Sequence, residues 1–132
     1  MASTHTLSTG TARTHTSGAA IARLERDLAD VVDGEVRFDA GTRGAYSTDG
    51  WNFRQVPIGV VLPRTVEAGA AAVIVCRKHG VPLLSRGGGT SLAGQCTNTA
   101  VVIDWSKYCY RVHNVDRETG RAWWNRGSFW MS

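Results

Sequence analysis

Three short apolar runs, divided by polar and glycine-rich segments, dominate the middle of the chain: residues 58–62, 81–84 and 100–104. Each has the length of a buried strand, and Pro57 and Pro63 mark both ends of the first. A helical pattern fills the gap between the first two runs. The order strand, helix, strand, loop, strand predicts a parallel β-α-β unit in an α/β fold. Ligands of such folds bind outside the carboxyl ends of the parallel strands.

The helix between the first two runs has clear ends. Thr65 is a suitable N-cap, and Glu67 places a carboxylate in the first turn, where the helix dipole favours it. The helix should run to about His79, which we expect to be a surface residue, and Gly80 should stop it. Its inward stripe is predicted to consist of Val66, Ala70, Val73 and Cys76 or Arg77, widened by Ile74.

The chain before the first run predicts a leader, a helix and a short strand. Residues 1–18 are rich in Thr, Ser and His and have almost nothing to bury, which is typical of a disordered segment. Residues 19–32 carry apolar positions at helical spacing, with Ser17 as the N-cap and Gly34 as the stop. Residues 35–38 predict a strand, and residues 39–48 a short helix or turn. The inward positions of the first helix would be Ile21, Leu24, Leu28 and Val31.

After the third run, residues 110–115 and 121–123 flank the turn sequence DRETG. A Gly-bearing turn between two such segments predicts a β-hairpin. It would begin a second, antiparallel subdomain, which makes the predicted fold α+β overall.

A glycine-rich segment follows the second apolar run directly. Gly87, Gly88 and Gly89 are followed at once by Thr90 and Ser91. Glycine lets a ligand approach the main chain closely, and successive free N–H groups bind anions. The two hydroxyls and the guanidinium of the preceding Arg86 add further donors. The segment predicts a diphosphate cradle; the alternative is a tight turn that binds nothing.

Neither common phosphate motif is present. A P-loop needs a lysine after its second glycine, but no lysine lies between Lys78 and Lys107. The dinucleotide fingerprint G-x-G-x-x-G begins at Gly87 and Gly89 but fails at Leu92.

The segment SRGGGTSLAGQCTNTAVVIDWSKY, within residues 57–108, resembles the flavin-binding region of the FAD-linked oxidase family. This family carries the FAD-binding domain of the p-cresol methylhydroxylase (PCMH) type. The most similar branch contains the flavin subunits of D-lactate dehydrogenase and glycolate oxidase. The resemblance extends from about Leu24 to Trp123, so residues 19–123 would be a partial FAD-binding domain.

The resemblance implies a cofactor and a set of binding residues. FAD would be the ligand, and in a complete relative it would oxidise a 2-hydroxy acid. Catalytic residues in such enzymes come mostly from a later substrate domain, so none is expected here. Because no histidine lies between His79 and His113, the flavin would be bound without a covalent link. The implied cofactor-binding residues are Arg86, Gly87, Gly88, Gly89, Thr90, Ser91, Gly94 and Gln95.

Composition narrows the remaining classes of function. The chain has 132 residues, 42% of them hydrophobic, and a formal charge of +4, which suits one small folded domain. Its basic residues are scattered, which disfavours a nucleic-acid interface. Three widely spaced cysteines favour free thiols, no metal site and a cytoplasmic location. No apolar stretch approaches the roughly 20 residues of a membrane span.

Residues 124–132 (WNRGSFWMS) fit neither the hairpin nor the family pattern. Back-translated with free choice of degenerate codons and read one nucleotide earlier, they can give VEPGVVLDE, close to what the family has there. We therefore expect a frameshifted or truncated reading frame that is inactive alone. The alternatives are a non-catalytic nucleotide-binding module and a non-functional gene fragment, whose third strand would be exposed and prone to pairing.

Overall fold

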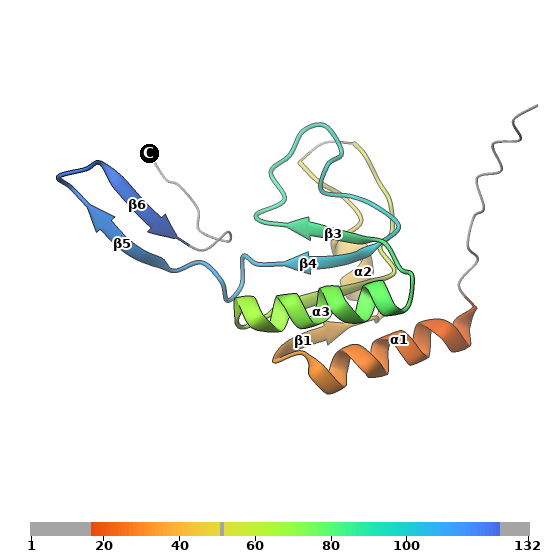
Figure 1. Cartoon of the computed structure of the whole chain (residues 1–132). Coiled ribbons are helices and arrows are strands. Elements are labelled where there is room, and N and C mark those ends of the chain that lie inside the picture. Colours follow the sequence, from red (N-terminus) through yellow and green to blue (C-terminus); the bar gives the residue numbers. More distant parts are fainter. Residues whose placement is uncertain (1–16, 51, 125–132) are drawn as a thin grey trace, which may run out of the picture.

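The computed structural model describes residues 17–50 and 52–124. Its centre is a four-stranded sheet with the order β1-β2-β4-β3 (Figure 1). The strands are β1 (Gly34–Arg37), β2 (Gly59–Pro63), β3 (Leu83–Arg86) and β4 (Val101–Asp104). β1 pairs with β2 in antiparallel orientation, whereas β2, β4 and β3 are parallel to one another. The predicted parallel unit is confirmed.

The order of the parallel strands departs from one expectation. The connection through α3 (Val66–Lys78) carries the chain past the position next to β2, and β4 then inserts between β2 and β3. All four residues of β4 are buried. The exposed third strand expected for a gene fragment is therefore wrong, and the edges of this sheet are β1 and β3.

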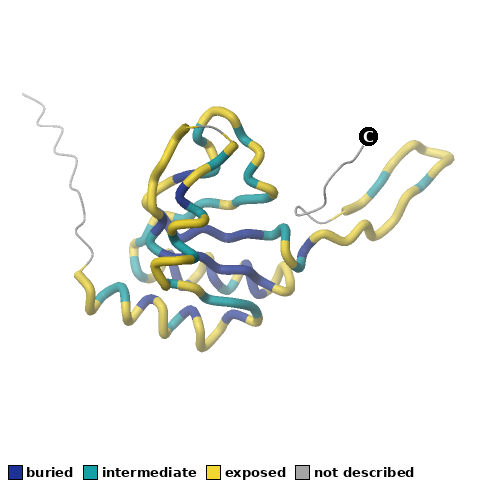
Figure 2. Tube along the Cα trace, turned by 180° about the vertical axis from the view of Figure 1, so that it is seen from behind, coloured by how far each residue is buried: buried dark blue, intermediate teal, exposed yellow. Residues whose placement is uncertain are grey.

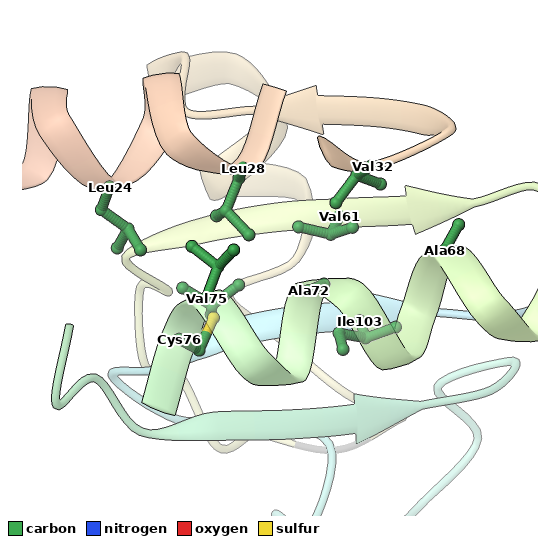
Figure 3. Close-up of a cluster of buried hydrophobic side chains, with 10 residues drawn as sticks. Leu24, Leu28, Val32, Val61, Ala68, Ala72, Val75, Cys76 and Ile103 are labelled. Carbon is green, nitrogen blue, oxygen red and sulfur yellow. The ribbon is translucent and has the colours of Figure 1, made fainter. Parts of the chain in front are cut away.

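α1 (Gly18–Val31) and α3 cover one face of the sheet (Figures 1 and 3). Ser17 caps α1 as predicted, since its side chain accepts a hydrogen bond from the Ala20 amide. Val31 is 51% exposed, contrary to the predicted inward stripe. The helix ends there, and the extended Val32 turns into the core in its place. The buried cluster on this face is Leu24, Leu28, Val32, Val61, Ala68, Ala72, Val75, Cys76, Val101 and Ile103.

α3 begins after Thr65 and stops before Gly80, as predicted, but of the predicted inward stripe only Cys76 is buried. Most of its buried residues are small, whereas Val66, Val73 and Ile74 are exposed. Gly69 shows why, because a Cβ there would lie 2.1 Å from the Trp105 ring. Small side chains let the helix approach closely, so the apolar stripe of the sequence is not the buried one. The buried residues of α3 are Ala68, Gly69, Ala72, Val75 and Cys76.

His79 is not the simple surface residue that the sequence predicts. Its Nε2 lies 2.7 Å from Asp27 Oδ2, and only 14% of its side chain is exposed. The pair joins the end of α3 to α1.

The other face of the sheet carries a smaller apolar cluster and α2 (Ala40–Ala45). Val60, Leu62 and Val102 form its centre, with Tyr46, Leu84 and Tyr108 packed around them. At the rim, Glu35 Oε1 accepts hydrogen bonds from Lys107 Nζ and from the Tyr108 hydroxyl, both at 2.5 Å.

β5 (Val112–Asp116) and β6 (Arg121–Trp124) form the predicted antiparallel hairpin. Figures 1 and 2 show it extending away from the main sheet, with most of its residues exposed. Within the described ranges, no helix combines the length and the apolarity needed to cross a bilayer.

Candidate functional site

The glycine-rich segment lies in a long irregular loop, residues 87–100, between β3 and β4. Parallel strands need a crossover connection, which is usually a helix. Here the loop leaves the carboxyl end of β3 and returns to the start of β4 without one (Figure 1). Long loops without secondary structure are uncommon in compact domains and are usually functional or disordered.

Hydrogen bonds fix this loop to the segment that follows α2. The Gly50 amide donates to Ser91 O at 3.1 Å, and the Gly94 amide donates to Asp49 Oδ2 at 2.8 Å. Thr97 donates to Gly94 O through both its amide and its hydroxyl. The loop is therefore held at several points.

Consecutive amides of the glycine-rich segment remain available to a ligand. The N–H groups of residues 87–91 donate to no acceptor in the part of the chain that the structure describes. Gly88 and Thr90 are exposed, and the other three residues are half-buried. An exposed row of donors without acceptors suits an anion.

The other predicted site residues have partners inside the protein. The Ser91 hydroxyl donates to Gln95 Oε1, and the Gly94 amide is taken by Asp49. Arg86 Nη1 points toward three main-chain carbonyl oxygens, those of Thr48 at 3.0 Å, Cys96 at 3.2 Å and Tyr46 at 3.4 Å. The structure thus brings all eight predicted residues into one loop and its base, and among the described residues the amides of residues 87–91 and of Gln95 have no acceptor.

Tyr46 and Asp104 belong to the same site, and sequence reasoning missed both. The Tyr46 ring lies under the Arg86 guanidinium, 5.1 Å from centroid to Cζ. Its hydroxyl donates to Asp104 Oδ2 at 2.5 Å. Burial, followed by this hydrogen bond, raises the pKa of Tyr46, so the phenol remains a proton donor.

Asp104 is 6% exposed and uses both of its carboxylate oxygens. Oδ1 accepts from the Ser106 amide at 2.8 Å and from the Ser106 hydroxyl at 2.6 Å. The sequence did contain one signal for this residue, because Asp104 is a carboxylate at the end of an apolar strand. A buried carboxylate needs hydrogen-bond partners.

The glycine loop does not line either of two surface hollows in the described part of the chain. One, of about 300 Å³, is lined by hairpin residues 120–124. The other, of about 180 Å³, is lined by residues of α1 and α3. Among the described residues, no group of three or more His, Cys, Asp or Glu side chains is placed to hold a metal ion.

Comparison with known proteins supplies the family context. The sequence pattern of the family described as "FAD binding domain" matches residues 57–131, which includes most of the tail that the resemblance did not cover. The glycolate oxidase subunit GlcD of Bacillus subtilis is 29% identical over 91 residues, 66% of this chain and 19% of GlcD. The mitochondrial D-lactate dehydrogenase [cytochrome] of Kluyveromyces lactis is 28% identical over 99 residues, 72% of this chain and 17% of that protein.

A solved structure shows the same fold. p-Cresol methylhydroxylase with bound substrate superposes with a TM-score of 0.75 over 86% of this chain and 24% of that one, at 17% identity. The chain spans less than a fifth of the length of the two curated relatives.

Proposed function

Because the chain belongs to the FAD binding domain family of the FAD-linked oxidases, we propose that it binds FAD through the amides of residues 87–91. The observation that carries the proposal is the row of five unpaired donors at the carboxyl end of β3. Two linked phosphates carry enough acceptor oxygens for such a row. We place the diphosphate of FAD there.

The site fits a diphosphate in a second respect. Gly89 has φ +71°, and a Cβ there would lie 2.3 Å from Arg86 Nη2. A side chain at this position would be strained by the backbone conformation and would displace the guanidinium. Thr90 adds a hydroxyl donor beside the amides.

In a complete relative, the bound flavin would accept a hydride from the carbon that carries the hydroxyl group of a 2-hydroxy acid. This substrate class is suggested by the two curated relatives, whose names refer to glycolate and D-lactate. Since this chain spans at most 19% and 17% of them, we expect little or no turnover of D-lactate or glycolate from it alone. A stoichiometrically yellow protein that reduces a dye with D-lactate would contradict this expectation.

Titration of the tryptophan fluorescence tests the binding itself. We expect FAD and ADP, which share a diphosphate, to bind and compete, whereas FMN and AMP, with one phosphate each, should bind much more weakly. Gly89→Ala should weaken the binding of both FAD and ADP. Gly80→Ala is the control, because Gly80 is another glycine with a positive φ, +64°. Binding of ATP and ADP without FAD would favour a nucleotide-binding module. FAD binding that is insensitive to Gly89→Ala would refute the proposed site.

We also propose that the flavin is held without a covalent bond. Of the two histidines that flank the loop in sequence, His79 is paired with Asp27 between α1 and α3. Acid precipitation of the flavin-loaded protein should release all of the yellow colour into the supernatant. The frameshift inferred for residues 124–132 stays a prediction, and sequencing the gene beyond codon 132 tests it.

A further inference from the structure

Arg86, Tyr46 and Asp104 form a connected group beneath the glycine loop. We propose that these three are positioning residues, which hold the loop in its ligand-binding shape from below while the amides above contact the anion. The inference rests on the proposed function for its ligand, but the ordering of the loop can be measured without one.

The guanidinium of Arg86 is enclosed by the loop that it supports. Nη1 serves three carbonyl oxygens from two segments, residues 46–48 and Cys96. Nη2 packs against Gly89, where no side chain fits. Arg86 thus joins both ends of the glycine loop to the segment after α2, and its planar fork suits this better than a lysine would.

Tyr46 also packs against the guanidinium. The ring stacks on it at 5.1 Å, and the hydroxyl is fixed by Asp104 Oδ2. Asp104 is also the register partner of Arg86 in the β3–β4 pair. Because Ser106 holds the other carboxylate oxygen, the chain of contacts runs from the central strand β4 to the loop.

The charge of Arg86 is satisfied by carbonyl dipoles, not by a carboxylate. Among the described residues, none of the ion pairs includes Arg86. The half-buried guanidinium lies against Gly89 in the row of unpaired amides, and a cation and free amides both favour an anion at the loop. Arg86 therefore contributes to anion binding through its field and through the shape of the loop.

Three variants test this arrangement. Tyr46→Phe removes only the hydroxyl, and Arg86→Lys keeps the charge but loses the fork. Tyr108→Phe is the matched control, since Tyr108 also donates its hydroxyl to a carboxylate, that of Glu35, and also lies beneath cations, outside the glycine loop. Amide hydrogen exchange is read at Gly50, Gly94 and Thr97, whose amides bond within the loop region, and at Val101 in the sheet.

We expect Tyr46→Phe and Arg86→Lys to speed exchange at the three loop amides by roughly tenfold, the order for losing a hydrogen bond of a charged group. Val101 should be unchanged, Tyr108→Phe should match the wild type, and the Kd for ADP should rise in the two loop variants. Loop exchange equal to the control, or an equal rise at Val101, would overturn the inference. Loosened loop amides with an unchanged Kd would support the positioning group and refute the diphosphate site.

Discussion

Gly89→Ala is the substitution that tests the glycine loop most directly. Gly89 has φ +71°, and an added Cβ would lie 2.3 Å from Arg86 Nη2 and 2.8 Å from its Cζ. Gly80, just beyond α3, has a similar φ of +64° but nothing within 4 Å of its Cβ position. The two alanine variants therefore share the backbone strain and differ in the contact with Arg86.

The strain and the contact have separable magnitudes. An L-residue in the left-handed region costs about 1–2 kcal/mol, which both variants incur. In Gly89→Ala the guanidinium must also move away from its three carbonyl oxygens, and hydrogen bonds of a charged group contribute about 1.5–3 kcal/mol. The free energy of opening the loop should therefore fall by about 2.5–5 kcal/mol in Gly89→Ala.

Urea unfolding and amide exchange separate the two effects. Gly80→Ala should lower the free energy of global unfolding by about 1–2 kcal/mol and leave exchange at Gly94 and Thr97 unchanged relative to the sheet. Gly89→Ala should raise exchange at those two amides at least about sixtyfold, since 1.4 kcal/mol is a factor of ten, and should raise the Kd for ADP at least about tenfold. If both variants changed loop exchange equally, the assigned contact between Arg86 and Gly89 would be refuted.

Three further outcomes follow from the packing and the charges. Gly69→Ala should destabilise the protein by about 1–3 kcal/mol through overpacking against the indole ring, whereas Gly44→Ala, with open space in α2, should stabilise it slightly; equal thermal shifts would contradict this. The pKa of Glu35 is lowered from 4.5 to about 2, chiefly by the hydrogen bond from its lysine partner, so its stabilisation is present above pH 4.5 and lost as the pH falls towards 2. Urea midpoints of Glu35→Gln should lack that part of the acid dependence. Burial raises the pKa of Cys76 to about 11, so iodoacetamide at neutral pH should modify the half-buried Cys96 first.

Local signals were sufficient for the elements of this fold. Ser17 and Thr65 cap the helices where their side-chain oxygens predict it, and the three apolar runs became the parallel strands. The inward face of α3 was not predictable from hydrophobicity, because close packing selects small residues such as Gly69 over larger apolar ones. A stripe of apolar residues on a helix predicts its buried face only when the neighbouring elements leave space for side chains of that size.

Tyr46 and Asp104, which support the glycine loop, could not be predicted from the sequence for a different reason. The glycine loop can be recognised from six consecutive residues, whereas Tyr46 and Asp104 are 58 positions apart in the chain. Their contact depends on β4 lying beside β2, the strand against which α2 packs, and the strand order is set by the crossovers and not by any local pattern. The sequence therefore predicted the amides of the glycine loop but not the residues that support this loop, Tyr46 and Asp104.

The two crossovers of the sheet show why the loop needs such support. Between β2 and β3 the connection is a helix, which satisfies most of its own amides and is held by packing. Between β3 and β4 a helix would consume the donors that a ligand requires, so the connection is irregular and its amides at residues 87–91 stay unpaired. A segment without main-chain hydrogen bonds of its own must be held in place by side chains. The Arg86 guanidinium does part of this by donating hydrogen bonds to three main-chain carbonyl oxygens. The unpaired amides and the half-buried Arg86 that supports their loop thus both follow from a connection that is not a helix.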